Sequence, residues 1–286
     1  MGKRGCVPGT VMPPGAAGVP SFSFPEAAVY ALSRSRDYGL MRNQPAGRVV
    51  NLPGIDLGKA KRIVESARDG WLPTESVFTL LAAYGIKSMA PRFAEDLDRA
   101  IGAAEDIGYP VALKLNSVTI IHKTEVGGVA LNIGSEEELK VAYHRMLGRV
   151  AGAGRASEVR GVTVQKMAGE GAELIAGITR DKTFGPLILF GLGGIYTELF
   201  KDRTVRIQPL TDIDAREMVR SVRAFKLLEG FRGEPPADIP AIEELLLRLS
   251  AMAEDLPMIK ELDLNPIRAF IAGEGYAVVD ARILID

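Results

Sequence analysis

Residues 108–129 read GYPVALKLNSVTIIHKTEVGGV, and this stretch decides the fold class more than any other part of the chain. Its apolar segment at 111–115 predicts a short buried strand that carries one lysine, Lys114. His122, one of only two histidines, follows that strand, and a Gly127-Gly128 turn closes the stretch. A cation, an imidazole that is nucleophilic when uncharged, and a flexible glycine backbone are the groups that a phosphate-handling site uses.

Lys114 is predicted to share a strand face with Ala112, because side chains alternate along an extended strand. A charged group in so apolar a strand requires an anionic partner or a route to water. A lysine that extends from the strand into solvent meets the second condition, and a phosphate ligand meets the first. The neighbouring glycine turn and a distant acidic cluster favour the phosphate.

The two histidines are interpreted differently. An isolated histidine is more often a surface or core residue than a catalytic one, and His144, between Tyr143 and Arg145 in a predicted helix, fits that description. His122 follows a β-branched apolar run and precedes two glycines. That placement favours a loop that presents a nucleophile.

A second cluster, ELDLNP at 261–266, predicts a site for a hard cation. Glu261, Asp263 and Asn265 alternate on a predicted strand, so their oxygens lie on one face, as Mg²⁺ coordination requires. Pro266 keeps Asn265 in the extended region. The alternative is a solvated strand face with no ligand.

Asp280 lies on the next predicted strand and is the fourth candidate of this cluster. A simple hairpin about Glu274 pairs Asp280 with Arg268 rather than with Asn265. A metal shared by Asp280 and Asn265 therefore requires a bulge or a shifted register.

The rest of the chain alternates helical and strand patterns, without an internal repeat. Further strands are predicted at 129–133, 162–167, 172–178, 187–190, 259–271 and 276–283, and helices at 72–81, 94–107, 214–229 and 240–254. Ser135 and Glu138 predict a capping box for a helix that ends before a loop at 149–158. Together these elements predict an α+β protein whose two lobes, at about 71–165 and 166–286, meet over a cleft.

Residues 1–70 predict an irregular and helical appendage, because 5–20 are crowded with Gly and Pro and two short helices follow. Among 286 residues, 35 are basic and 36 acidic, so the net charge of −1 offers no bulk attraction to nucleic acid or anionic lipid. The single cysteine, Cys6, fits a reducing cytoplasm. No apolar run reaches the roughly 18 residues of a membrane span, and no signal-peptide core follows the start.

Several motifs of other kinds of active site are absent from the sequence. The sequence contains no Walker motif, no Cys/His metal spacing and no Gly-x-Ser-x-Gly elbow. Gly191-Leu-Gly-Gly194 is a weak signal by itself, but it follows a buried-type strand and leads to Glu198 and Asp202.

These segments, in this order, resemble the ATP-grasp region of nucleoside-diphosphate-forming acyl-CoA synthetases from about residue 72 to 285. The resemblance implies an ATP-grasp fold with Mg-ATP between the lobes and His122 as a phosphohistidine. It also implies a reaction that interconverts acyl-CoA, ADP and phosphate with acid, CoA and ATP. The nucleotide contacts that it implies are Lys114 at the phosphates, Gln165, Lys166 and Met167 near adenine, the glycines Gly127, Gly128, Gly193 and Gly194, and Glu173; the implied Mg²⁺ ligands are Asp263, Asn265 and Asp280.

Residues 18–28 resemble the end of the same family's CoA-ligase part, while the CoA-binding domain and most of the ligase domain have no counterpart here. The resemblance therefore implies a CoA-binding and CoA-ligase partner for full turnover. Three alternatives remain open. They are a regulatory nucleotide-binding module, an ATP-grasp ligase that works through an acyl phosphate and needs no histidine, and a truncated gene product with no role of its own.

Overall fold

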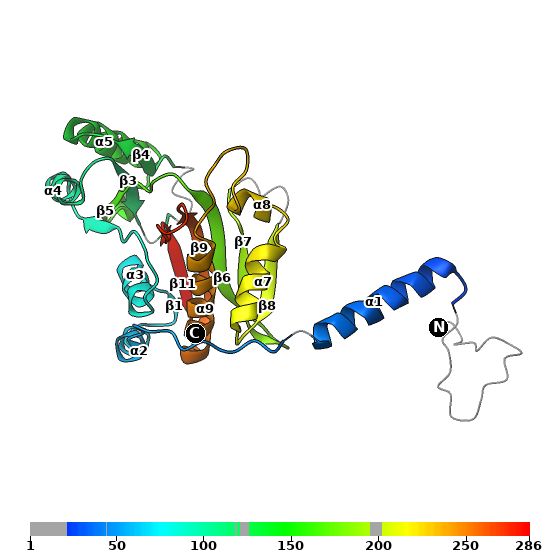
Figure 1. The fold of residues 1–286 in the computed structure, drawn as a ribbon. Helices are drawn as coiled ribbons and strands as arrows, with labels where there is room; N and C mark the ends of the chain where they lie inside the picture. Colours follow the sequence, from blue (N-terminus) through cyan, green and yellow to red (C-terminus); the bar gives the residue numbers. More distant parts are fainter. Residues whose placement is uncertain (1–21, 44, 118, 121–125, 195–201) are drawn as a thin grey trace, which may run out of the picture. The chain divides into compact units, whose positions relative to one another are not determined.

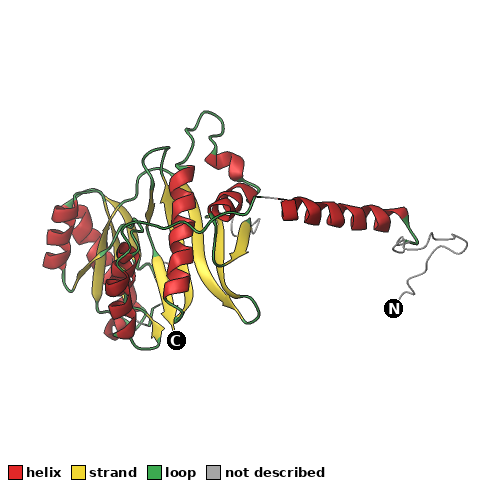
Figure 2. Ribbon diagram, turned by 60° about the horizontal axis from the view of Figure 1, so that its bottom comes forward, coloured by secondary structure: helices red, strands yellow, loops and turns green. Residues whose placement is uncertain are grey.

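The computed structural model describes residues 22–43, 45–117, 119–120, 126–194 and 202–286. The chain divides into two compact units, residues 1–46 and 47–286. In the first unit, helix α1 (Pro25–Asn43) has no buried residue. The second unit contains two antiparallel sheets with their helices (Figures 1 and 2).

The larger sheet has seven strands in the order β1-β11-β9-β6-β7-β8, and β10 also pairs with β9. All its pairings are antiparallel. The strands are β1 (Gly70–Trp71), β6 (Ala172–Asp181), β7 (Gly185–Leu192), β8 (Arg203–Ile207), β9 (Ile259–Ala269), β10 (Tyr276–Val278) and β11 (Ala281–Ile285).

Apolar side chains gather on one face of this sheet. Alternate residues of β6, β7, β9 and β11 form a single buried cluster with five helices. Burial on one face alone leaves polar side chains on the other, so this sheet has a covered face and an open face. The covering helices are α2 (Leu57–Glu65), α3 (Thr74–Ala83), α7 (Asp212–Ser221), α8 (Phe225–Leu228) and α9 (Ile239–Asp255).

The smaller sheet has the order β2-β5-β3-β4 and a core of its own. Helices α4 (Leu97–Ile107) and α5 (Glu136–Gly152) pack on it. Its strands are β2 (Arg92–Ala94), β3 (Val111–Asn116), β4 (Val129–Ile133) and β5 (Gly161–Lys166), and a short 3₁₀ helix spans Ala156–Glu158. Helix α3, which the sequence placed with this lobe, contributes to the core of the larger sheet instead.

The α+β prediction is confirmed, and the strands expected from the sequence are present, except that the single strand expected at 276–283 is two strands, β10 and β11, interrupted at 279–280. Two expectations about helices were wrong. The helix expected at 214–229 is two helices, because the buried carboxylate of Asp202 accepts the N–H groups of Arg223 (2.8 Å) and Ala224 (2.9 Å), which ends helical hydrogen bonding there. The loop expected at 149–158 is shorter, since α5 continues to Gly152.

Smaller differences concern helix starts and short strands. Residues 92–94 form β2, so the next helix begins at Leu97 with Asp96 as its cap, rather than at 94. Ser135 does cap α5, but the Glu138 carboxylate accepts from Gly134 N–H instead of closing a capping box on Ser135. β8 was not anticipated. In the part of the chain that the structure describes, no helix is long and apolar enough to cross a bilayer.

Candidate functional site

The β9–β11 hairpin brings the predicted metal ligands together. Tyr276 pairs with Ala269 and Ala281 with Leu264, so the hairpin register is shifted by three residues from the simple hairpin about Glu274. Asp280 consequently lies beside Asn265, and its carbonyl oxygen accepts the Asn265 N–H at 3.1 Å. The pairing of Asp280 with Arg268 does not occur, since Arg268 faces Ala277.

A bulge keeps further polar residues of β9 on the open face. Leu264 pairs with Ala176 but Ile267 with Leu174, so Asn265 and Pro266 together oppose Ile175. This extra residue reverses the alternation: Leu262 and Leu264 are in the core before it, and Ile267 after it. Arg268 therefore lies on the same face as Asp263.

Asp263 lies among three other charged side chains that influence its pKa. Desolvation by the surrounding protein raises its pKa above the ordinary aspartate value. The charge of Arg282 opposes this shift, while those of Glu261 and Asp280 add to it. A carboxylate whose charged form is disfavoured among other carboxylates is stabilised by a bound cation.

The donor set fits Mg²⁺. Asp263, Asn265 and Asp280 supply hard oxygen atoms, and one Asp280 oxygen, Oδ1, also accepts the Ala281 N–H at 2.9 Å. Among the described residues, no group of three or more His, Cys, Asp and Glu is arranged to hold a metal. A Mg²⁺ ion held by these two carboxylates and one amide would keep coordination positions for other oxygen ligands.

Glu173 and the glycine loop adjoin this face. Glu173 Oε1 forms an ion pair of 2.7 Å with Arg268, and the Glu173 carbonyl accepts the Gly193 N–H at 2.7 Å. Gly194 has a φ of +62°, and a Cβ there would lie 2.7 Å from Glu173 Oε2. Glu173, Gly193 and Gly194 line a cavity of about 920 Å³. Its other walls are Glu170, Gly171, Ala172, Leu192, Leu227, Phe231, Arg232, Glu234, Pro235, Ala237, Ala269, Phe270 and Ile271.

On the smaller sheet, Lys114 lies where the sequence placed it. It pairs with Thr163 of β5 and Val129 of β4, while the flanking Leu113 and Leu115 are buried in the core under α4 and α5. Lys114 is therefore on the sheet face away from these helices. Its side chain is half-buried.

The Gly127-Gly128 turn lies beside β3. The Gly128 carbonyl accepts the Leu115 N–H at 2.8 Å. Gly127 has a φ of +66°, and a Cβ there would lie 2.6 Å from an Arg149 guanidinium nitrogen. The positive φ favours glycine at this position, and a side chain here would also displace the Arg149 guanidinium.

The segment 165–167 is split between two faces. Gln165 pairs with Ala112 and so lies on the Lys114 face, two residues along β5 from Thr163. Its Nε2 donates to the Met89 carbonyl and, at 2.7 Å, to the Val279 carbonyl. Lys166 pairs with Val111 on the opposite face, so the structure does not bring it together with Lys114.

Val279 precedes Asp280, so the bond from Gln165 to the Val279 carbonyl joins two parts of the structure. They are the smaller sheet, which carries Lys114 (the Lys114 sheet), and the β9–β11 hairpin, which carries the candidate metal ligands (the metal hairpin). Strand residues rise about 3.3 Å each, so Lys114 is about 7 Å along β3 from the Ala112–Gln165 pair. The structure thus connects the sheet that carries the Lys114 cation to the hairpin that carries the carboxylates, and a metal-bound phosphate chain requires both kinds of group.

His122 lies outside the described residues. His144 is exposed on α5, with its ring edge-on to Tyr143 at 5.8 Å. Arg268 is the functional candidate that the sequence did not give. Three positions after Asn265, it is on the wrong face for a regular strand, and only the bulge brings it to the site.

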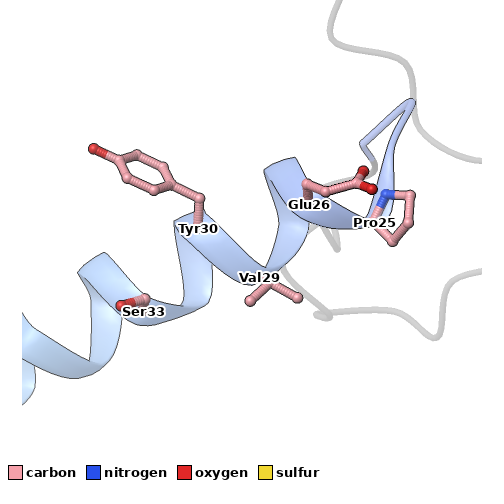
Figure 3. A pocket seen from close by; sticks show the side chains of 5 residues that line it. All are labelled: Pro25, Glu26, Val29, Tyr30 and Ser33. Carbon is pink, nitrogen blue, oxygen red and sulfur yellow. The ribbon is translucent and has the colours of Figure 1, made fainter.

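A second hollow lies along α1 and is lined by Pro25, Glu26, Val29, Tyr30 and Ser33. Figure 3 shows these side chains on successive turns of that single helix. No candidate residue from the sequence is among them.

Comparison with known proteins places the fold in a family. The ATP-grasp domain family matches residues 63–285. The chain is 42% identical over 271 residues to the ADP-forming acetate–CoA ligase I of Archaeoglobus fulgidus, with 94% of this chain and 39% of that protein covered. It is 46% identical over 207 residues to the β subunit of the ADP-forming acetate–CoA ligase II of Pyrococcus furiosus, covering 72% of this chain and 88% of that subunit.

A solved relative extends the comparison to structure. It is the dinucleotide-forming acetyl-coenzyme A synthetase 1 of Ca. Korarchaeum cryptofilum, in complex with coenzyme A and Mg-AMPPCP, with its phosphohistidine segment pointing towards the nucleotide-binding site. The TM-score is 0.68 at 38% identity, with 80% of this chain and 99% of that chain covered. The present chain spans less than two-fifths of the length of the Archaeoglobus relative.

Proposed function

We propose that this chain, which belongs to the ATP-grasp family and within it to the ADP-forming acetate–CoA ligases, is the phosphoryl-transfer component of an ADP-forming acyl-CoA synthetase. The proposed net reaction converts an acid, CoA and ATP into acyl-CoA, ADP and phosphate. The observation that carries this proposal is the shared open face of Asp263, Asn265 and Asp280, joined through Gln165 to the sheet of Lys114.

In this proposal each group has a distinct task. Asp263, Asn265 and Asp280 hold Mg²⁺, which neutralises charge on the phosphate chain. Lys114 binds the phosphates, and the adenine lies near Gln165 and Met167. The backbone N–H groups of the Gly127-Gly128 turn and of Gly194 face the transferred group, where fixed dipoles stabilise developing charge. The Gly193 N–H is held by the Glu173 carbonyl and shapes the loop. Glu173 orients the second glycine pair.

His122 is the proposed nucleophile. A ring nitrogen of the uncharged imidazole attacks the γ-phosphorus, the bond from that phosphorus to the bridging oxygen of the β-phosphate breaks, and ADP leaves. The resulting phosphohistidine carries the phosphoryl group to the CoA-ligase part, where it activates the acid. Imidazole suits both steps because it is a good nucleophile and a good leaving group near neutral pH.

The domain limits remain part of the proposal. Residues 1–70 are the end of a CoA-ligase domain with a linker, and 71–286 are the ATP-grasp domain, with lobes at about 71–165 and 166–286. In the structure, residues 47–70 belong to the same compact unit as the ATP-grasp domain, and α3 packs in the core of the second lobe. Two observations support this division. The match to the ATP-grasp family begins at residue 63, and the alignment with the longer Archaeoglobus relative extends over 94% of this chain. The proposed partner is a CoA-binding and CoA-ligase subunit or domain, because β subunits occur among the relatives. The single cysteine supports a cytoplasmic location.

The test is transfer of label from γ-labelled ATP in the presence of Mg²⁺. Wild type is compared with His122→Ala and with the matched control His144→Ala, which removes the other histidine from an exposed helix position. We expect acid-labile, base-stable label on wild type and on the control, and none on His122→Ala. Equal label on all three proteins would contradict the assignment of His122. ATP binding without any label would favour a regulatory nucleotide-binding module.

A further inference from the structure

Gln165 is a buried polar side chain whose amide is fully committed to the protein. It is 2% exposed. Its Nε2 donates to two carbonyl oxygens, those of Met89 and Val279, which are 76 and 114 residues away in sequence. Because both neighbouring groups are acceptors, the Gln165 amide must turn its NH₂ group, and not its oxygen, towards them. The two bonds use both hydrogens of that group. The nitrogen therefore has no hydrogen left for a nucleotide.

Its partners lie at the junction between the two sheets. The chain passes between the sheets twice, at 84–91 before β2 and at 167–171 after β5. The first crossing is fastened to β10, since Met89 N–H donates to the Val278 carbonyl at 2.8 Å and Val278 N–H to the Lys87 carbonyl at 3.0 Å. Gln165 stands at the start of the second crossing. One side chain thus ties both crossings to the hairpin.

The same bonds connect the two halves of the candidate site. Val279 precedes Asp280, whose carbonyl oxygen accepts from Asn265. Two residues before Gln165 on β5, Thr163 pairs with Lys114. We propose that Gln165 is a positioning residue, which fixes the Lys114 sheet relative to the metal hairpin so that one Mg-ATP reaches both. This inference rests on the proposed function, in that Lys114 and Asp280 must hold the same nucleotide.

A purely structural role of Gln165 predicts a different result. If Gln165 only satisfied two carbonyls, its replacement would destabilise the protein, while each folded molecule would bind and transfer phosphate as before. If it positions the site, folded molecules are impaired at saturating ATP. A misplacement of about 1 Å costs up to about 100-fold in rate, because the reacting atoms must be held close and aligned.

The experiment uses the full chain with Gln165→Glu, which keeps the shape but turns an oxygen towards the two carbonyls. Gln208→Glu, after β8 on the far edge of the larger sheet, makes the same chemical change as a control. Three quantities are measured: Mg-ATP affinity, the rate of phosphoryl labelling at saturating Mg-ATP, and hydrogen exchange at the Met89 and Val278 amides. We expect labelling of Gln165→Glu to slow by about 10- to 100-fold per folded molecule, with faster exchange at both amides, and no change in the control.

Gln165→Leu, which removes the bonds without adding charge, is the second variant and decides the result if the glutamate variant does not fold. Unchanged labelling per folded molecule in the variants, with only a lower melting temperature, would overturn the positioning role. Unchanged exchange at Met89 and Val278 would overturn it as well. If wild type itself binds no ATP, the proposed function fails, and the exchange comparison still decides whether Gln165 fastens the junction.

Discussion

Gly194→Ala probes the packing of the glycine loop against Glu173. A methyl group at this position lies 2.7 Å from Glu173 Oε2, which is 0.7 Å short of ordinary contact at 3.4 Å. The φ of +62° adds about 1–2 kcal/mol of backbone strain for any residue with a Cβ. The carboxylate must withdraw, which loosens its ion pair with Arg268; because both side chains are about a third exposed, that pair contributes at most about 1 kcal/mol.

Part of this cost is offset, because alanine restricts the unfolded chain by about 0.4–1 kcal/mol. The free energy of unfolding is therefore expected to fall by about 1–2 kcal/mol, and the melting temperature by several degrees. Gly102→Ala is the matched control, since it lies within α4, has no atom within 4 Å of the added methyl and should stabilise that helix by about 0.5–1 kcal/mol. The two variants are compared by urea and thermal unfolding. A Gly194→Ala protein as stable as wild type would refute the reasoning.

Three further changes test other parts of the structure. Asp202→Asn replaces a charged acceptor of two backbone N–H groups, so urea unfolding should show a loss of about 1.5–3 kcal/mol; a loss under 0.5 kcal/mol would show that the carboxylate does not hold the break between α7 and α8. Tyr84→Phe removes the buried hydroxyl that donates to Asp255 at 3.0 Å and should cost about 1.5–3 kcal/mol in the same assay, whereas wild-type stability would discount that bond. Because the pKa of Asp263 is raised, its ionisation disfavours the folded state: the stability it contributes is complete below the ordinary aspartate pKa and is lost as pH rises through the raised value. Asp263→Asn should therefore melt higher than wild type at about pH 7 without Mg²⁺ but not at about pH 3.5, and equal melting temperatures at pH 7 would contradict this.

Local patterns predicted the strands and the faces of individual residues. The alternation around Lys114 and the alternation of Glu261, Asp263 and Asn265 both hold, because burial on one face selects apolar residues at every second position. The side-chain period of a strand is visible in a few residues, so no distant information is needed.

The strand register and the bulge could not be predicted from those local patterns. The sequence left the pairing of Asp280 open, since turn length, rather than strand composition, sets the hairpin register. It also gave no sign that Arg268 lies on the face of Asp263, because a one-residue bulge changes the face without changing any residue type.

Long-range polar contacts were likewise not predictable. Asp202 ends a helix about 20 residues later in the chain, and the helical pattern of 214–229 contains no sign of it. The resemblance implied only that Gln165 lies near the nucleotide, and it gave no sign that the amide binds carbonyls of two segments that only the folded chain brings near. Such contacts depend on tertiary packing, which overrides local preference.

The measurement that tests the central claim most directly is calorimetric binding of a non-hydrolysable ATP analogue, with and without Mg²⁺. Wild type is compared with Lys114→Met, Asp280→Asn and the control Lys182→Met, which lies exposed in the β6–β7 turn. One nucleotide site built from both sheets predicts Mg²⁺-dependent binding to wild type and the control. It predicts at least about tenfold weaker binding, or about 1.4 kcal/mol, for each of the other two variants. Wild-type affinity in either Lys114→Met or Asp280→Asn would contradict the account.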